Sequence, residues 1–352
     1  MADSTSTQTG IGDLAARIDE SGYGPYVKGA LGFGLLAALP YLLDVGVAGI
    51  SLGSVLTLKV LILTLVFAYS SQAWNIVSGF TGYFSFGHAA FFGVGAYATQ
   101  KLAIDFGINP WIGMLVGGGI AVLVALLVGF LNFRYDLKGH YFALATFAIA
   151  MLLGVVVRNT SELGGAIGYY RPFPREYGAE YGLLAFQFQS DLPYYYVIFA
   201  FLVVVTVVAY ALKESQLGLY LFAIRENENA AASVGIPTFR YKMLAISVSA
   251  FFTAWAGAFW SMYFEIIRPS TVFGLSKNVE ILLPAVVGGL GTVPGAIVGA
   301  FFVFPLAEFF RANVDQIVGL DDVVYGVALV LVALVLPNGL ISLRERIRER
   351  RD

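Results

Sequence analysis

The sequence predicts an all-α polytopic membrane protein. Hydrophobic residues make up 58% of the 352 residues and charged residues only 12%, about half the usual charged share of a globular domain. Long windows contain no lysine, arginine, aspartate or glutamate: 60–100, 106–133, 139–157, 192–212, 243–264, 281–307 and 323–343. A membrane-spanning helix needs about 20 mostly apolar residues, and one charge at its centre costs about 2.5–3.5 kcal/mol. These windows are therefore expected to be membrane spans.

The same composition excludes several kinds of chemistry. The chain has no cysteine and only two histidines, His88 and His140, so disulfides, thiolate metal sites and a histidine-rich metal centre are excluded. A net charge of −2 provides no basic face for nucleic acid. No lysine directly follows a glycine, as a Walker A phosphate-binding loop requires. We therefore expect no metal, no cofactor, no nucleic-acid partner and no enzymatic activity of the chain itself.

The elements are expected in the following order. Residues 1–27 lack the basic start of a secretory signal and are expected to be a cytoplasmic tail. The first apolar stretch, 28–50, is interrupted by Pro40 and Asp44 and is the weakest span. A second helix is expected at 54–78 and, after a glycine-flanked break at 79–82, a third at 83–104. A fourth follows the Asn109–Pro110 turn to about Phe133, and the next three are expected at 139–157, 193–212 and 243–264.

Basic residues predict the orientation of the chain. The tail 341–352 holds five arginines, and loop 213–242 is also rich in lysine and arginine, so both are expected on the cytoplasmic side. An even number of crossings must then separate them, and 243–264 and the last span at 323–340 provide two. The stretch 279–310 must cross twice or not at all, and its glycine-rich break predicts a pair of short helices. The permease domain 28–340 then has about eight to ten crossings, both termini are cytoplasmic, and loop 158–192 is extracytoplasmic.

Loop 213–242 contains a predicted short helix. Glu226, Glu228 and the alanines at 230–232 favour helix, and Gly235 and Pro237 are typical stop signals. About ten residues give a helix about 15 Å long, lying across the cytoplasmic mouth. The alternative interpretation is an ordinary amphipathic connector.

Several motifs in this chain occur together in a known family. They are Asn75–Gly79, Ser85–Tyr97, Leu137–Tyr141, Ala223–Glu226, Glu280–Leu283, Gly288–Gly291 and Pro337–Leu340. Over residues 55–345 they resemble the permeases of branched-chain amino acid ABC importers, of the LivM type. Two departures concern the solute: His140 stands where the family usually has Asp, and residues 163–168 keep only part of a segment typical of the family.

The resemblance implies both partners and residue roles. The predicted short helix would be a coupling helix that docks onto an ATPase, with roles for Arg225, Glu226, Glu228, Ala231 and Gly235. The partners implied are a second permease chain of the LivH type, two ABC ATPase subunits and an extracytoplasmic solute-binding protein, all at the cytoplasmic membrane. Lipid surrounds the spans.

An energy argument favours the same class. Concentrating a solute a thousandfold costs about 4 kcal/mol, and this chain has no phosphate-binding loop. A proton- or sodium-coupled carrier needs intramembrane carboxylates, whereas Asp44, Glu265, Glu280 and Glu308 all lie near predicted span ends. The driving force must therefore come from a partner.

Two groups of residues are candidates for the solute path or for helix packing. Ser85, His88, Phe92, Gly95 and Thr99 follow one face of the predicted third helix, and Asn75 and Ser78 lie one turn apart on the second. These residues would line a path for a zwitterionic or uncharged solute, or else pack helices together. The glycine-rich break and its Gly-xxx-Gly steps favour close helix packing, and the residues concerned are Gly288, Gly289, Gly291, Pro294, Gly295 and Gly299.

The sequence supports one hypothesis and leaves three alternatives. The hypothesis is the permease subunit of an ABC importer that moves branched-chain or other hydrophobic amino acids inward. A urea or short-amide importer shares the motifs, and the ligand of the binding protein distinguishes the two. A channel or ion-coupled carrier would work alone in liposomes. An intramembrane enzyme lacks both cysteine and paired intramembrane carboxylates. The solute, and whether the permease pair is a homo- or heterodimer, stay open.

Overall fold

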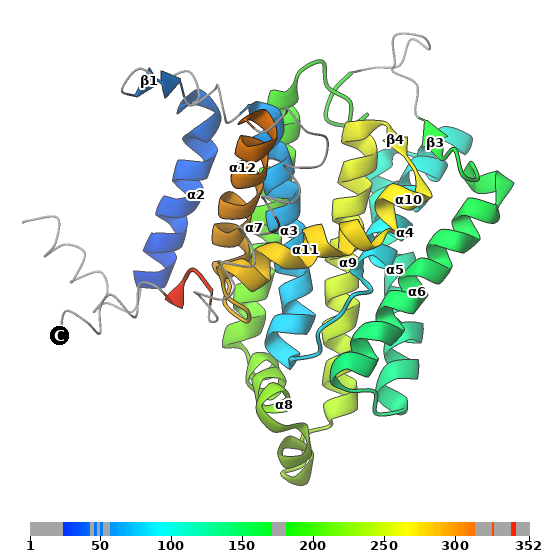
Figure 1. Cartoon of the computed structure of the whole chain (residues 1–352), viewed down its shortest axis with the longest axis vertical. Helices are drawn as coiled ribbons and strands as arrows, with labels where there is room; N and C mark the ends of the chain where they lie inside the picture. The colour runs from blue at the N-terminus through cyan, green and yellow to red at the C-terminus, as the bar shows by residue number, and fades with distance from the viewer. Residues whose placement is uncertain are drawn as a thin grey trace, which may run out of the picture. The chain divides into compact units, whose positions relative to one another are not determined.

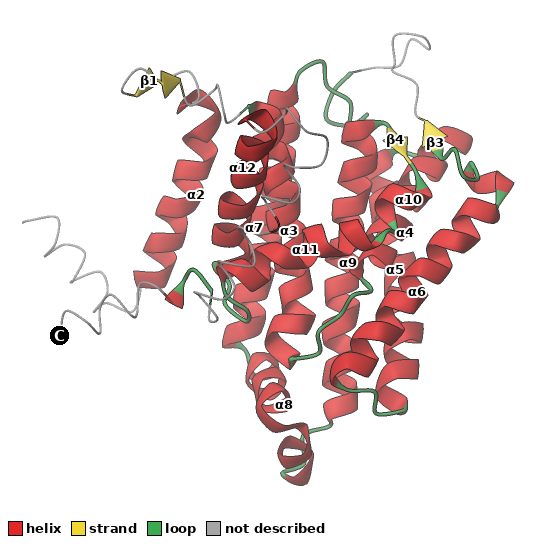
Figure 2. Ribbon diagram, in the orientation of Figure 1, coloured by secondary structure: helices red, strands yellow, loops and turns green. Residues whose placement is uncertain are grey.

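A computed structural model of the chain describes residues 24–42, 46–47, 50–51, 57–170, 181–313, 326 and 339–342. The described part is overwhelmingly helical, with strands of two residues at most (Figure 2). The chain divides into two units, 1–54 and 55–352. The predicted all-α class is confirmed.

The first unit contains one helix and a short hairpin. Helix α2 (Gly24–Leu42) is followed by strands β1 (Gly46–Val47) and β2 (Ile50–Ser51), which pair antiparallel. The predicted helix at 28–50 is therefore too long at its C-terminal end. Pro40 lies inside the last turn and lacks a backbone donor, and residues 46–47 and 50–51 pair as strands instead.

The second unit is built around one buried helix. In helix α3 (Leu58–Thr81), every residue from Val60 to Thr81 except Leu63 is buried. Thr57 caps its start, because its hydroxyl accepts a bond from the Val60 N–H at 3.3 Å. Gly82, with φ of 75°, ends it.

Further long helices accompany α3 in the second unit (Figure 1). They are α4 (His88–Asp105), α5 (Pro110–Arg134), α6 (Gly139–Asn159), α7 (Asp191–Glu214) and α9 (Thr238–Phe264). Helices α4, α5 and α9 pack against one another, and α7 and α9 pack against α3. The observed order agrees with the sequence prediction, although α9 begins before the expected residue 243.

The predicted third helix at 83–104 is wrong at its start, because α4 begins only at His88. The preceding residues form a loop held by side chains of other helices. Ser78 Oγ accepts the N–H of Ser85 at 3.2 Å, and Thr146 Oγ1 accepts that of Phe86 at 3.1 Å. Backbone donors that are bonded in this way do not need a helix.

The glycine-rich break separates two helices, as predicted. Short helix α10 (Pro269–Val272) leads into α11 (Leu275–Gly288), and α12 (Gly295–Asn313) follows the break. Figure 1 shows α11 running across α3, and both α11 and α12 pack against α3. A two-residue ladder joins β3 (Tyr169–Tyr170), which follows the 3₁₀ turn Ser161–Leu163, to β4 (Ile266–Ile267).

Six segments of the described residues are long and apolar enough to cross a membrane: Leu58–Thr81, Pro110–Arg134, Gly139–Asn159, Asp191–Glu214, Thr238–Phe264 and Pro269–Gly288. The protein is therefore a multi-pass membrane protein. The predicted last span at 323–340, most of tail 1–27 and most of tail 341–352 lie outside the described residues.

Candidate functional site

Helix α8 (Gln216–Ser233) lies between α7 and α9 and occupies one end of the second unit (Figure 1). It consists of two helices, because Asn227 has extended backbone angles of φ −160° and ψ 102°. The Asn227 side chain accepts a bond from the N–H of Ala230 at 3.0 Å and so caps the second helix. The predicted single ten-residue helix is therefore wrong, since this cap divides it. The predicted stop is present, because Gly235 has φ of 91° directly after the helix.

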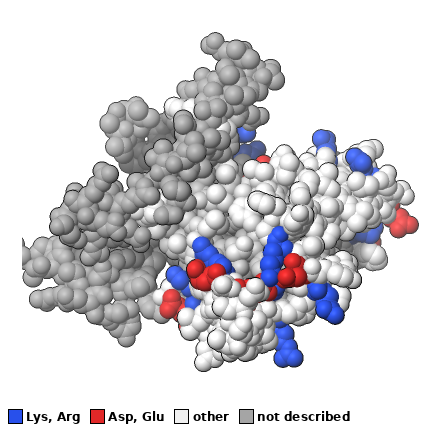
Figure 3. Space-filling view, turned by 60° about the horizontal axis from the view of Figure 1, so that its bottom comes forward, with Lys and Arg blue, Asp and Glu red and all other residues white. Residues whose placement is uncertain are grey.

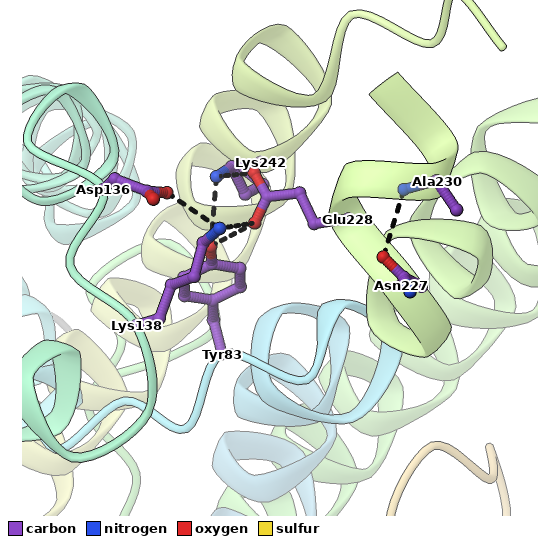
Figure 4. Close-up of polar contacts among 7 residues, drawn as sticks. All are labelled: Tyr83, Asp136, Lys138, Asn227, Glu228, Ala230 and Lys242. Atoms are coloured by element: carbon purple, nitrogen blue, oxygen red, sulfur yellow. Dashed lines mark hydrogen bonds and ion pairs between the residues drawn. The ribbon is translucent and has the colours of Figure 1, made fainter. Parts of the chain in front are cut away.

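Glu228 begins the second part of α8 and points toward the long helices (Figure 4). Its carboxylate accepts a hydrogen bond from the hydroxyl of Tyr83 and forms an ion pair with Lys242 of α9. Lys138, directly before α6, lies 3.7 Å from the same carboxylate and 3.0 Å from Asp136. One carboxylate on α8 thus joins the α3–α4 loop, α6 and α9. We call these five side chains the Glu228 cluster.

The Glu228–Lys242 pair at the centre of the cluster is largely buried, whereas Lys138 and Asp136 at its edge are exposed. The side chain of Lys242 is 2% exposed and that of Glu228 is 15% exposed. The ammonium of Lys242 also lies 4.7 Å from the ring centroid of Tyr83 and 4.8 Å from that of Phe133, and both ring faces attract it. Removing either member of a buried ion pair leaves an uncompensated charge, which is strongly destabilising.

These contacts shift the ionisation of the cluster. Burial alone would raise the pKa of the Glu228 carboxyl, but the Lys242 and Tyr83 hydrogen bonds outweigh it and hold that pKa below its usual value. The bond to Asp136 raises the pKa of Lys138. Both groups are therefore charged at neutral pH.

Arg225, in the first part of α8, reaches the end of α3 and the glycine-rich break. Its Nη1 donates a hydrogen bond to the carbonyl of Gly79 at 2.7 Å. A Cβ on Gly291 would lie 2.3 Å from the same nitrogen and 2.9 Å from the Gly79 carbonyl. Gly291 also has φ of 77°. Only glycine leaves room for the guanidinium between α3 and the break.

Asn75 connects α3 to the same break. Its Nδ2 donates to the carbonyl of Thr292 at 2.9 Å, and its Oδ1 accepts the N–H of Gly291 at 2.9 Å. Both polar ends of this buried amide therefore bind the break. A continuous path of contacts runs from Arg225 through Gly79, Gly291 and Asn75. The predicted coupling helix and the predicted break are thus adjacent in space.

His88 is the centre of a second buried polar network. Its Nε2 lies 2.7 Å from the hydroxyl of Ser249, which itself donates to the carbonyl of Ala73 at 2.6 Å. Because that hydroxyl has only one proton to donate, Nε2 must carry the imidazole proton. Nδ1, 3.1 Å from Ser85 Oγ, then accepts. The network ties α3, α4 and α9 together.

The predicted polar stripe is only partly a helix face. Ser85 precedes α4, so it does not belong to the face formed by His88, Phe92, Gly95 and Thr99. Thr99 is buried against α5, where a Cβ on Gly113 would lie 3.2 Å from its Cα. A role of Asn75, Ser78, Ser85, His88 and Thr99 in solute passage stays a prediction.

The glycines of the break lie at close backbone crossings. A Cβ on Gly288 would lie 1.8 Å from the Gly295 carbonyl, and one on Gly299 would lie 1.9 Å from that of Pro284. Gly289 has φ of 133°, and Pro294 accepts the first bond of α12 from Val298 at 3.0 Å. This geometry favours the packing interpretation.

Charged side chains gather on the face that carries α8 (Figure 3). The exposed ones at this end are Arg134, Asp136, Lys138, Glu214, Arg225, Glu226 and Arg240. Glu226, in the first part of α8, is exposed, whereas Ala231, in the second part, is only 4% exposed. The two predicted coupling residues therefore differ: Glu226 is available to a partner, and Ala231 packs inward.

Two buried lysines, Lys242 and Lys277, were missed by the sequence analysis, and Glu280 was misplaced. Lys242 was assigned to a polar loop, although it lies in the first turn and a half of α9 and is buried. Lys277 and Glu280 form an ion pair at 2.6 Å on α11, inside a candidate span, so the prediction that Glu280 lies near a span end is wrong. Opposite charges three residues apart in an apolar segment were the available signal.

Known proteins resemble this chain over most of its length. The family described as "Branched-chain amino acid transport system / permease component" matches residues 56–333. The high-affinity branched-chain amino acid transport system permease protein LivM of Escherichia coli K12 is 26% identical over 306 residues, which cover 82% of this chain and 70% of that protein. A probable LivM of Methanocaldococcus jannaschii is 25% identical over 71% of this chain and 77% of its own length.

Another permease type is similar over a shorter region. The permease protein LivH of Escherichia coli K12 is 28% identical over 131 residues, or 37% of this chain and 41% of that protein. No solved structure matches the chain. The family match includes α3 to α12, and with them the Glu228 cluster and the glycine-rich break. The chain belongs to the family of permease components of branched-chain amino acid transport systems.

Proposed function

We propose that the chain is the LivM-type translocation subunit of an ATP-binding-cassette importer that moves branched-chain amino acids into the cell. Separate ATPase subunits would dock on α8 and supply the energy. The observation that carries this proposal is the attachment of α8 by two charged side chains. Glu228 reaches the starts of α6 and α9, and Arg225 reaches the end of α3 and the glycine-rich break.

This attachment gives α8 a mechanical role. When the ATPases close, they would push on exposed α8 residues such as Glu226, with α8 on the cytoplasmic side. The Glu228 ion pair and the Arg225 hydrogen bond would transfer that displacement to separate helices. Since packed interfaces switch between discrete arrangements rather than deforming continuously, the path through the break would change in one step.

The family and the sequence support the partners. The chain has no Walker A loop, which supports ATPases on separate subunits. The LivH relatives are permease proteins in their own right, which supports a second permease chain of that type. A solute-binding protein would deliver the solute at loop 158–192, on the opposite side from α8, in the cytoplasmic membrane.

Uptake by the reconstituted complex tests the proposal. Proteoliposomes would contain the two permeases and the two ATPases, with the binding protein and labelled leucine outside. We expect ATP-dependent leucine accumulation that Glu228→Gln reduces at least tenfold while ATP hydrolysis continues. Glu214→Gln provides the control, because this exposed residue at the end of α7 has no ion pair in the described part of the chain.

Three outcomes would contradict the proposal. Full leucine uptake by the Glu228→Gln variant would show that Glu228 does not couple α8 to the long helices. Accumulation by the isolated chain in an ion gradient would favour a secondary carrier. ATP-dependent uptake of urea, with none of leucine, would favour the short-amide importer.

A further inference from the structure

An ion pair lies deep in the apolar part of the molecule, away from the Glu228 cluster. Lys277 and Glu280 are three residues apart on α11, with Nζ and Oε2 2.6 Å apart. The Lys277 ammonium lies over the ring of Phe67. Phe67 belongs to α3, a helix of 24 residues, and comes nine residues after its first residue, Leu58. At 1.5 Å per residue, that ring is about 13 Å from one end of α3 and about 21 Å from the other. The pair is therefore at membrane depth.

The cation of this pair is enclosed by aromatic rings. The Lys277 ammonium lies 3.7 Å from the ring centroid of Trp260, 4.8 Å from that of Phe67 and 5.4 Å from that of Phe92. Its side chain is only 3% exposed. Three ring faces attract the positive charge and keep lysine in place without a second carboxylate.

The carboxylate of the pair, that of Glu280, is partly exposed. The side chain of Glu280 is 41% exposed. A partly bare carboxylate at this depth cannot face lipid without a large cost, so it faces a water-filled cavity or another polar group. Its neighbours on α11 include two apolar side chains, Val279, which is 39% exposed, and Leu283, which is partly exposed one turn further, and one exposed hydroxyl, that of Ser276 one turn before.

We propose that Glu280, Lys277 and the adjacent apolar face of α11 form a recognition site for a zwitterionic amino acid with an apolar side chain. The proposal rests on the proposed transport function and identifies where in the path the solute is bound. The exposed carboxylate of Glu280 accepts hydrogen bonds from the α-ammonium, and the positive charge of Lys277, enclosed beside it, attracts the α-carboxylate electrostatically rather than by direct contact. Val279 and Leu283 contact the aliphatic side chain.

Charge balance explains why both ions are present. In the empty site, Lys277 compensates Glu280, so that no net charge is buried. A zwitterion adds one charge of each sign, and the loaded site stays neutral. A solute with only one charge would leave a net charge at membrane depth, which is expensive. The site therefore selects against simple carboxylates and simple amines.

Trp260 provides a direct reporter for this site. The chain has four tryptophans, so 5-fluorotryptophan labelling gives four fluorine NMR resonances, and Trp260→Phe assigns one of them. The sample is the labelled chain with its partner permease in lipid nanodiscs, without binding protein. We expect leucine to shift the Trp260 resonance in a saturable way and leave the other three in place. The same concentration of 4-methylpentanoate, which lacks the ammonium, should not shift it.

Variants separate solute binding from structure. Glu280→Gln should need at least a tenfold higher leucine concentration for the same shift, and Glu280→Asp should recover part of the response. Glu308→Gln is the matched control, because it removes the carboxylate of another three-residue pair, with Arg311 at 3.1 Å, and should respond like the unchanged chain.

The inference is overturned if the intact complex takes up leucine while the Trp260 resonance stays still, or if leucine and 4-methylpentanoate shift it equally. It is also overturned if Glu280→Gln folds, as judged by its three other resonances, and binds leucine normally. In each case the proposed transport function would stand. A complex that fails to accumulate leucine with ATP would instead refute the proposed function.

Discussion

Single residues in the Glu228 cluster differ in how much stability they contribute. Glu228→Gln or Lys242→Met leaves one buried charge without its partner, and each should lower the free energy of unfolding by about 3–5 kcal/mol. The double substitution removes both charges and should cost clearly less than the sum of the two. Denaturation of the purified chain in mixed micelles would measure all three.

Lys138 serves as the control for that comparison. Its side chain is 42% exposed, and Lys138→Met should cost below about 1 kcal/mol, as for exposed ion pairs. Two results would show that burial does not determine the stability of the cluster. One is an equal loss of unfolding free energy in Lys138→Met and Lys242→Met. The other is a loss in the Glu228→Gln/Lys242→Met double variant that equals the sum of the two single losses.

The lowered pKa of the Glu228 carboxyl should make the stability of the fold depend on pH. Its pKa in the folded state is lower than the ordinary value of 4.5, so the unfolded chain takes up this proton first as the pH falls. The stabilisation is complete above the ordinary value and is lost as the pH falls through the lowered one. We expect the free energy of unfolding to decrease below about pH 4.5, with a smaller decrease in Glu228→Gln. Identical pH profiles would contradict this assignment.

At the scale of elements, the contact between α8 and the glycine-rich break is sterically narrow. Gly291→Ala would place a Cβ 2.3 Å from Arg225 Nη1, at a residue whose φ of 77° disfavours a side chain. We expect the guanidinium to be displaced and ATP-driven uptake to fall at least tenfold. Gly119→Ala on α5 should retain uptake, because its Cβ would meet nothing within 4 Å. Normal uptake by Gly291→Ala would show that this contact does not couple the two elements.

The division of α8 at Asn227 is a second property of an element. Asn227→Ala removes the cap on the Ala230 N–H and should cost about 0.5–2 kcal/mol of helix stability. Asn227→Ser restores a capping oxygen and should keep uptake near that of the unchanged chain, while Asn227→Ala lowers it. Proteoliposome uptake would measure both, and equal activities of the two variants would argue against a role for the cap.

The long helices could be predicted from the sequence, whereas the polar contacts between them could not. The windows without charged residues gave the approximate bounds of α5, α6, α7 and α9. They could do so because a charged side chain in lipid is costly whatever its neighbours are, so each span can be recognised from its own residues. The start of α4 was missed because Ser78 and Thr146, on other helices, hold the loop before it. The aromatic enclosure of Lys277 depends on Phe67, Phe92 and Trp260, which only tertiary packing brings together.

At the scale of the whole molecule, two of the ion-paired regions in the described part of the chain bear on transport. The Glu228 cluster lies where α8 meets the long helices, and the Lys277–Glu280 pair lies at membrane depth on α11. The glycine-rich break ends α11 and receives contacts from both Arg225 and Asn75. Movement of α8 would therefore reach the helix that carries the proposed recognition site.

Site-specific cross-linking tests the docking role of α8 most directly. Because the chain has no cysteine, Ala232→Cys places a unique thiol on an exposed position of α8, and Val298→Cys on α12 is the control. In the intact complex we predict that a short bifunctional reagent joins the α8 thiol, but not the control thiol, to an ATPase subunit and that ATP changes the yield. Labelling of the α8 thiol by a membrane-impermeant reagent from outside the cell, or its cross-linking to the solute-binding protein, would contradict the account.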